Sequence, residues 1–337
     1  MAKWYQQRGF QDDVVLSTRI RLARNISGIP FPTRMTKEDA QKTIDAVSDA
    51  LSGFNYKFHG YPLGKLDKME AQALLEEYQI SPKMLEQKEG RAVFLSADNK
   101  VSIMVNEEDH IRMQCLFAGF ETEKAFDLIN KVDDYLSEKI DFAFHETYGY
   151  LTACLTNAGT GMRVSYMLHL PALCLSGKAA GLFSAVSKLG IAVRGLYGEG
   201  SDAAGHLFQI SNQVTLGLSE QEIISKMTDV INQIITKERE MRNALLKENK
   251  LLVEDKVWRS YGLLQHARLM STKELMETLS YVRLGIAASL IDGVSFEAVN
   301  TAMIESRPAH VIKQSGKDLT PAQRDAARAA QLRKIFS

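Results

Sequence analysis

Features typical of secreted, membrane and metal-binding proteins are scarce in this chain of 337 residues. Its three cysteines, Cys115, Cys154 and Cys174, are too few and too scattered for a disulfide framework or a CxxC metal site. No stretch approaches the roughly 18 uninterrupted apolar residues of a transmembrane helix, and the first residues contain no apolar signal segment. We therefore expect a cytoplasmic protein without a resident metal ion.

An excess of charge of one sign is missing too. Lys and Arg total 41, and Asp and Glu also total 41, which argues against a general nucleic-acid or membrane-surface protein. The stretch from Ser306 to the end departs from this balance, with seven basic residues against two acidic ones. A solvated, charged final helix explains that local excess, and an anionic partner for the tail is the alternative.

The familiar nucleotide-binding signatures are also absent. The chain contains neither a GxxxxGK[ST] loop nor the HRD and DFG motifs of protein kinases. Residues 198–203 match the GxGxxA pattern, but the strand predicted before them is short and no helix obviously follows. We therefore do not predict dinucleotide binding there.

What the chain does contain is a clear order of predicted elements. Strands are predicted at 14–21, 92–95, 101–105, 163–170 and 191–194, and helices at 36–51, 121–138 and from 171 to about 189, with a glycine-rich loop at 195–205. After residue 218 the periodicity is helical, with a long connecting helix at 219–248 and then a small bundle. This order predicts an α+β fold with a mixed domain at 1–240 and a helical domain at 241–337.

Arginines on the predicted strands offer a way to hold phosphate groups. The planar guanidinium matches phosphate oxygens in pairs and stays charged at any working pH. Arg19 and Arg21 are two apart on a strand and so share a face, and Arg112, Arg163 and Arg194 each lie at or near a strand end. A surface ion pair is the ordinary explanation for any single arginine, so the surrounding motifs must decide.

Four motifs around these arginines resemble the signature blocks of the phosphagen (guanidino) kinases. They are STRIR at 17–21, NEEDHIR at 106–112, CLTNAGTGMR at 154–163 and VRGLYGE at 193–199. The resemblance covers about residues 14–218 and implies an antiparallel sheet flanked by helices, with Mg-ATP as phosphoryl donor and a guanidinium as acceptor. It implies that ATP is lined by Ser17, Thr18, Arg19, Ile20, Arg21, Tyr78, Arg112, Arg163, Val164, Ser165, Tyr166, Met167, Arg194, Gly195, Leu196, Tyr197, Gly198 and Glu199.

The same resemblance assigns the acceptor side. Glu108 and Glu199 match the two carboxylates that hold the guanidinium, and Cys154 matches the reactive cysteine beside it. The ordinary alternatives are a solvated acidic loop for Glu108 and a small buried apolar residue for Cys154. The family usually has a histidine near the adenine where this chain has Tyr78, which could instead stack on the base.

The kind of acceptor is suggested by the arrangement of the chain. Kinases of small guanidines have about a hundred residues of helical domain before their first arginine block, whereas here that block starts at Ser17 and the extra helical region follows it. This resembles the protein-arginine kinase branch of the family. The alternatives are a kinase for free arginine or another small guanidine, and a non-catalytic adaptor that binds phospho-arginine.

A motif in the last predicted helix supports the same branch. Residues 324–329 match an RDxxRA pattern that the resemblance identifies as an allosteric phospho-arginine pocket, formed by Arg324, Asp325, Ala326, Ala327, Arg328 and Ala329. Arg324 and Arg328 are four apart and so share a helical face, although a solvated helix would show the same spacing. The resemblance further implies a homodimer, protein substrates with exposed arginines, a stress-response role with the Clp ATPase and protease machinery, and a zinc-binding activator of the McsA type.

Overall fold

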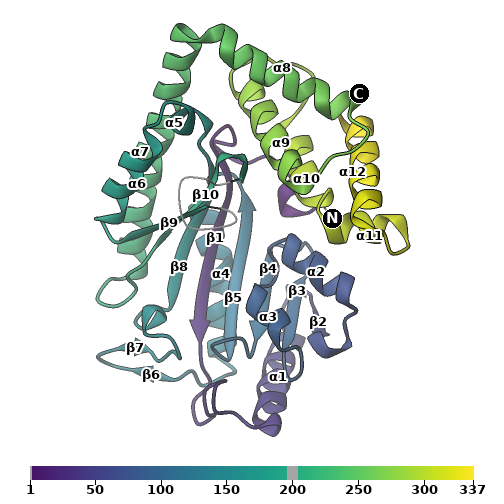
Figure 1. Ribbon diagram of the computed structural model, residues 1–337. Coiled ribbons are helices and arrows are strands. Elements are labelled where there is room, and N and C mark those ends of the chain that lie inside the picture. Colours follow the sequence, from purple (N-terminus) through teal and green to yellow (C-terminus); the bar gives the residue numbers. More distant parts are fainter. Residues whose placement is uncertain (1, 196–203) are drawn as a thin grey trace.

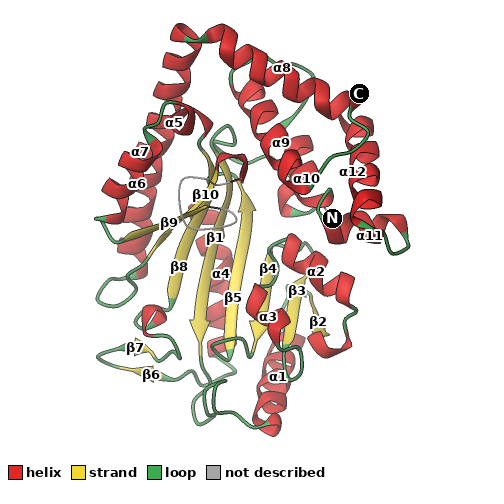
Figure 2. Cartoon of the chain, viewed as in Figure 1, coloured by secondary structure: helices red, strands yellow, loops and turns green. Residues whose placement is uncertain are grey.

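The computed structural model describes residues 2–195 and 204–337, and its main feature is one eight-stranded sheet (Figures 1 and 2). Neighbouring strands are antiparallel, in the order β2-β3-β4-β5-β1-β8-β10-β9. The strands are β1 (Val15–Arg24), β2 (Phe58–Pro62), β3 (Ala92–Ser96), β4 (Val101–Val105), β5 (Ile111–Ala118), β8 (Met162–His169), β9 (Ile191–Gly195) and β10 (Leu207–Asn212). A separate hairpin consists of β6 (Phe144–His145) and β7 (Gly149–Tyr150). Together with the helices, this confirms the predicted α+β fold.

Strand β1 lies between β5 and β8, and its side chains differ between the two faces of the sheet. Ile20 and Leu22 are buried in the main core, whereas Arg19 and Arg21 are only partly buried. Successive side chains of a strand point to opposite faces, so one face of β1 is apolar and the other carries the arginines.

Helices cover the apolar face. The helices α1 (Lys37–Ser52), α4 (Thr122–Ser137) and α7 (Glu220–Glu248) contribute Val47, Ile129 and Ile231 to the core that contains Ile20. In α4, Ile129, Val132 and Leu136 recur at helical spacing and are fully buried, as the sequence pattern predicts. Figure 1 shows α4 behind the sheet.

Two short helices lie next to the polar face, at the β3 and β4 side of the sheet. The short helices α2 (Lys68–Glu76) and α3 (Pro82–Glu86) lie beside β3 and β4, where Met84 packs with Val93 and Met104 in a small separate core. A cavity over the polar side chains of β1 and β5 begins beside these helices, with residues of both helices in its wall.

The C-terminal helices form a second core at one end of the sheet. They are α8 (Lys250–His266), α9 (Thr272–Ala287), α10 (Phe296–Glu305), α11 (Pro308–Ser315) and α12 (Pro321–Phe336). Val257, Leu279 and Leu332 are fully buried in this core, together with Leu16 from β1 and Leu207 from β10. The helical bundle is therefore packed onto the strands themselves.

Two predictions about the helices have different outcomes. The single helix predicted from 171 to about 189 is wrong, because the chain forms α5 (Pro171–Leu175) and α6 (Ala179–Ser187), separated at Gly177 with a φ of 71°. The predicted connecting helix is confirmed as α7, which begins after Ser219; the Ser219 hydroxyl accepts a hydrogen bond from the backbone N–H of Glu222.

The domain boundary predicted between 240 and 241 falls within α7 and stays a prediction. Among the described helices, none is both long and apolar enough to cross a membrane.

Candidate active site

A cavity of about 720 Å³ lies over the polar face of the sheet. Four of the five arginines singled out in the sequence line it, namely Arg19, Arg21, Arg112 and Arg194. They come from three different strands, and the antiparallel pairing brings them together: Arg112 is in β5, on one side of β1, and Arg194 is in β9, beyond β8 and β10. The strands thus create an arginine cluster that is widely spaced in the sequence.

The fifth arginine, Arg163, belongs to the same cluster. It lies opposite Arg21 in the pairing of β1 with β8, and its guanidinium donates hydrogen bonds to the Ser211 hydroxyl at 3.2 and 3.1 Å. Burial lowers the pKa of Arg163, and the nearby charges of Arg194 and Arg112 lower it further. All five predicted arginines are therefore gathered around one site.

Neutral groups and one carboxylate fix the positions of the arginine side chains in this cluster. Arg19 donates to the side-chain oxygen of Gln209 at 3.0 Å, and Arg112 lies 2.5 Å from a carboxylate oxygen of Glu107. Glu107 also accepts a hydrogen bond from the hydroxyl of Ser81. A neutral amide fixes the direction of Arg19 and leaves its positive charge in place.

The electrostatics of the cluster favour an anion. Burial lowers the pKa of Arg19 to about 10, and the charge of Arg112 contributes in the same direction. Burial also moves the pKa of Arg21 well below its ordinary value, and the charges of Arg19 and Arg112 lower it further. Both arginines are only partly buried and line the cavity, so these shifts mean that their cationic forms lose part of their hydration and repel one another. A polyanion such as a triphosphate would relieve both costs.

The pleat of the strands divides the residues that were predicted as continuous nucleotide-binding runs. Ile20 and Val164 are buried in the main core on the helix-covered face. Thr18 is also buried and donates its hydroxyl to the carbonyl of Gly119, and the Tyr166 hydroxyl bonds that of Thr122. Because only alternate residues of a strand share a face, the side-chain contacts of these four residues lie away from the arginines. Their part in nucleotide binding stays a prediction, and Tyr166 is also a lining residue of a cavity that contains Arg19. Ser17, Ser165 and Met167 lie on the arginine side.

Glu108 lies in the loop between β4 and β5 and is held from two sides. Its Oε2 is 2.8 Å from the ammonium of Lys83 in α3, and its Oε1 accepts a hydrogen bond from Asn157 at 3.0 Å. Partial burial would raise the pKa of this carboxyl, but the hydrogen bond and charge of Lys83 outweigh it and hold the pKa below its ordinary value. Glu108 is therefore ionised at neutral pH.

The loop around Glu108 is fixed by a buried histidine. The His110 Nδ1 accepts from the backbone N–H of Ile26 at 3.0 Å, which leaves Nε2 to donate to the Pro30 carbonyl at 2.8 Å. Burial lowers the pKa of His110, in keeping with this neutral form. The contacts of His110 are thus structural.

The predicted cysteine lies near the same carboxylate. Cys154 precedes the 3-10 turn η3 (Leu155–Asn157), whose last residue, Asn157, bonds Glu108. The Cys154 sulfur is 3.0 Å from the Thr156 hydroxyl and is partly exposed. Both Glu108 and Cys154 lie close enough to Arg163 to act on its pKa, so the acceptor residues border the arginine cluster. The other predicted acceptor, Glu199, lies outside the described residues, as do Leu196, Tyr197 and Gly198.

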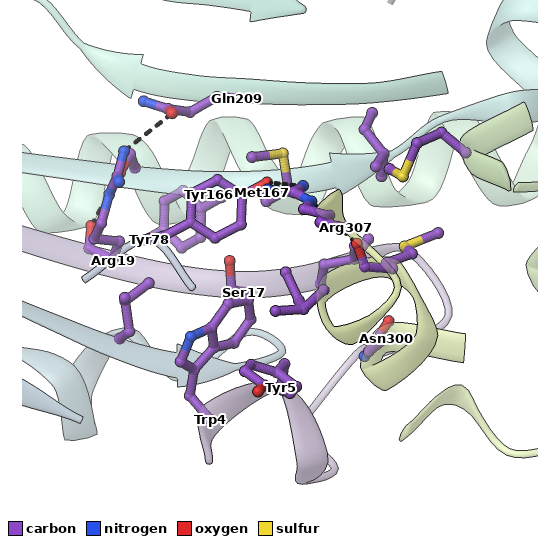
Figure 3. A pocket seen from close by; sticks show the side chains of 17 residues that line it. Trp4, Tyr5, Ser17, Arg19, Tyr78, Tyr166, Met167, Gln209, Asn300 and Arg307 are labelled. Carbon is purple, nitrogen blue, oxygen red and sulfur yellow. Dashed lines mark hydrogen bonds between the residues drawn. The ribbon is translucent and has the colours of Figure 1, made fainter. Parts of the chain in front are cut away.

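A smaller apolar cavity adjoins the arginine-lined one (Figure 3). The two share Arg19, Tyr78, Met167, Gln209 and Arg307 as lining residues. Arg307 comes from the C-terminal bundle and was not anticipated from the sequence, where nothing distinguishes it from other charged residues of the tail. Lys83 and Asn157 were missed as well, although Asn157 stands inside one of the four signature blocks.

The predicted phospho-arginine motif lies on α12, and its two arginines differ in environment. Arg328 is buried and donates to the carbonyls of Ser306 and Met270 at 2.7 and 2.6 Å, and to Asp325 at 2.6 Å. Arg324 is only partly buried. The role of this motif in binding phospho-arginine stays a prediction.

Comparison with known proteins finds matches to two family models and to solved structures of similar fold. Residues 39–241 match the family model of the ATP:guanido phosphotransferase C-terminal catalytic domain, and residues 250–337 match that of the protein-arginine kinase McsB C-terminal domain. In fold, lombricine kinase has a TM-score of 0.63 at 24% identity, covering 71% of each chain. The duplicated taurocyamine kinase of Schistosoma mansoni has a TM-score of 0.62 at 27% identity, covering 67% of this chain and 33% of that one.

Relatives of nearly the same length are more similar in sequence. The protein-arginine kinase of Desulforamulus reducens is 47% identical, with 99% of this chain and 95% of the relative covered. That of Bacillus subtilis is 45% identical, with 99% of this chain and 93% of the relative covered. These matches span both the sheet and the bundle. The chain therefore belongs to the ATP:guanido phosphotransferase family and, within it, to the protein-arginine kinases.

Proposed function

We propose that this protein transfers the γ-phosphoryl group of Mg-ATP to the guanidinium group of arginine side chains in other proteins. The observation that carries the proposal is the cavity lined by Arg19, Arg21, Arg112 and Arg194, with the ionised Glu108 close enough to Arg112 for its pKa to respond to that charge. The names of the full-length relatives support a protein as the acceptor.

In this proposal the arginine cluster binds and orients the triphosphate. Arg19, Arg21 and Arg112 would neutralise its charge, and fixed donors of this kind stabilise the charge that spreads over the transferring group. Mg²⁺ is expected to arrive on the phosphates, because it keeps several waters and is usually held through substrate oxygens. The described wall fits this, since it is lined by arginines and its carboxylate, Glu76, already accepts hydrogen bonds from the backbone N–H groups of Ala309 and His310.

Glu108 would hold and activate the acceptor. A guanidinium is a poor nucleophile while it is protonated and delocalised, so a carboxylate must orient it and take its proton. The reaction forms a nitrogen–phosphorus bond, breaks the bond from the γ-phosphorus to the β,γ-bridging oxygen, passes the proton to Glu108 and releases ADP. Glu199 is the second carboxylate of this proposal, and Cys154 would stand beside the acceptor.

The experiment is to incubate the protein with Mg-ATP and an arginine-rich protein such as casein. Mass spectrometry under conditions that preserve the nitrogen–phosphorus bond should find phosphate on arginine. Glu108→Gln should slow transfer by roughly 10²–10⁴-fold, the usual contribution of a general base. The matched control is Glu277→Gln, an exposed glutamate on α9, which should leave the rate unchanged. Phosphate found only on Ser, Thr or Tyr would refute the proposal.

The same assay separates the two alternatives. A kinase for small guanidines would consume ATP faster with free arginine than with casein. An adaptor would bind phospho-arginine without transferring phosphate, and its binding would not respond to Glu108→Ala.

The wider setting is also part of the proposal. It includes a homodimer in the cytoplasm, a stress response in which modified proteins pass to the Clp ATPase and protease machinery, and a zinc-binding activator of the McsA type. A phospho-arginine pocket on α12 would use Arg324 for the phosphate, with Asp325 beside it for the guanidinium. These assignments are suggested by the family and by the match to its C-terminal domain.

A further inference from the structure

Tyr78 has a backbone conformation that tyrosine rarely adopts. Its φ is 62°, in the left-handed region where a side chain is strained. Two backbone contacts hold it there: its N–H donates to the Leu75 carbonyl at 3.0 Å, and its own carbonyl accepts from the Gln114 side chain at 2.5 Å. Such strain persists only where the surroundings determine it, and it is concentrated at functional sites.

The side chain of Tyr78 is held by Arg307 from the C-terminal bundle. Arg307 Nη2 donates to the Tyr78 hydroxyl oxygen at 2.6 Å, and its guanidinium carbon lies 5.0 Å from the centre of the ring. Arg307 itself is buried, and donates through Nε to the Met303 carbonyl at 3.1 Å and through Nη1 to the Glu76 carbonyl at 3.2 Å. The guanidinium therefore has a fixed position from which it orients the tyrosine.

The place of this pair points to the nucleotide. Tyr78 and Arg307 are lining residues of both the arginine-lined cavity and the apolar cavity beside it (Figure 3). Tyr78 also lies close enough to Arg19 to act on its pKa. The pair thus forms the wall where the two cavities meet, next to an arginine of the phosphate cluster.

The geometry also indicates what Tyr78 can offer. A tyrosine hydroxyl has one proton and can accept as well as donate. Because Arg307 donates to its oxygen, the hydroxyl proton remains for another acceptor. The guanidinium also covers one face of the ring, so a base has less room to stack there than the sequence alone suggested.

We propose that the Tyr78 hydroxyl donates a hydrogen bond to a ribose or phosphate oxygen of bound ATP, and that Arg307 is the positioning residue that holds it there. This inference rests on the proposed function. It makes the C-terminal bundle a part of the nucleotide site, because the side chain that fixes Tyr78 comes from the segment between α10 and α11.

The test is calorimetric titration of the full chain with Mg-ATP, together with steady-state kinetics. Tyr78→Phe keeps the ring and removes the hydroxyl, and should weaken ATP binding about fivefold, the loss expected for one hydrogen bond, with kcat within about twofold of the original. Tyr61→Phe, on the exposed edge strand β2, is the matched control and should bind ATP normally.

A double-mutant cycle tests the partnership. Arg307→Met should weaken ATP binding by a similar factor, and adding Tyr78→Phe to it should cost little more, because residues that act together are not additive. Arg307→Lys keeps a hydrogen-bond donor but lacks the planar guanidinium, and should recover part of the affinity for ATP. Circular dichroism shows whether each variant is folded.

Two results would overturn the inference. One is unchanged ATP affinity in Tyr78→Phe, and the other is fully additive losses in the cycle. If Arg307→Met does not fold, Tyr78→Phe and Arg307→Lys still decide. Failure of the unaltered protein to bind ATP at all would instead refute the proposed function, so the two failures are distinguishable.

Discussion

The ammonium group of Lys83 lies 2.8 Å from Glu108 Oε2, on the carboxylate that is proposed to hold the acceptor. In the proposed reaction, the guanidinium of the acceptor would have to replace this ammonium group on Glu108. More than half of the Lys83 side chain is exposed, so it can move aside at little cost. Lys83 therefore helps to hold the pKa of Glu108 below its ordinary value in the free protein.

Replacing Lys83 by Met should change the pH dependence of the reaction. The pKa of Glu108 is held low, so activity that needs its carboxylate is lost only as pH falls through that lowered value. Without Lys83 the pKa rises toward its ordinary value of about 4.3, and the acid limb of kcat/KM should move to higher pH. Profiles of the two proteins across the acid range, with circular dichroism to exclude unfolding, check this; coincident acid limbs would contradict it.

Arg21→Met should weaken ATP binding without destabilising the free protein. The pKa of Arg21 is lowered by burial and by its arginine neighbours, so its charge opposes folding until an anion binds. We expect an unchanged or higher Tm without ligand, and ATP affinity lower by at least about tenfold from the lost charged hydrogen bonds. Thermal unfolding with and without Mg-ATP measures both, and Arg34→Met, at an exposed arginine, is the control. A lower Tm without ligand would argue against this account.

His310 should make the attachment of the bundle to α2 depend on pH. Its Nδ1 lies 2.8 Å from Glu76 and its Nε2 lies 3.0 Å from Glu77, which itself bonds Lys3. Although burial acts in the other direction, hydrogen bonds to Glu76 and Glu77 raise the pKa of His310. A raised pKa stabilises the fold below the ordinary value of about 6.5, and this contribution is lost as pH rises through the folded-state value.

The matching measurement is Tm as a function of pH from mildly acidic to mildly alkaline conditions. We expect the unaltered protein to lose stability toward alkaline pH in this range more steeply than His310→Gln. His59→Gln, at an exposed histidine of β2, should keep the original slope. Parallel curves of Tm against pH for the original protein and His310→Gln would show that Glu76 and Glu77 do not raise the pKa of His310.

The two arginines of the α12 motif should respond differently to replacement. Arg328→Ala removes hydrogen bonds to Ser306, Met270 and Asp325, and should lower the free energy of unfolding by about 3 kcal/mol. Arg324→Ala should leave stability almost unchanged and abolish binding of a phospho-arginine peptide. Denaturant unfolding and peptide titration of both variants check this division of roles. Equal destabilisation by both would mean that Arg324 is structural too.

Local patterns predicted the parts of this site that depend on one strand. Arg19 and Arg21 share a face because they are two apart, and the period of a strand fixes this without knowledge of its neighbours. The same rule indicates that the side chains of Ile20 and Val164 lie on the opposite face, in the main core. The break at Gly177 was missed because the apolar pattern continues on both sides of it.

Contacts between distant segments could not be predicted in the same way. Tyr78 and Arg307 are separated by 229 positions, and their hydrogen bond depends on how the bundle packs against the sheet. Likewise, nothing local to Lys83 indicates that it reaches Glu108 across the loop after β4. Contacts of this kind depend on tertiary packing, whereas a sequence motif contains only residues that are close along the chain.

Leu16 and Leu207 belong to strands of the catalytic sheet, but their side chains are buried among the helices of the bundle. This has a consequence for how such a kinase could exchange its tail during evolution. A recombination event that joined the sheet to a different C-terminal segment would leave both leucines in water, at a cost of about 1.5–3 kcal/mol for each side chain, unless they changed too. The sheet and the tail are therefore expected to be inherited together.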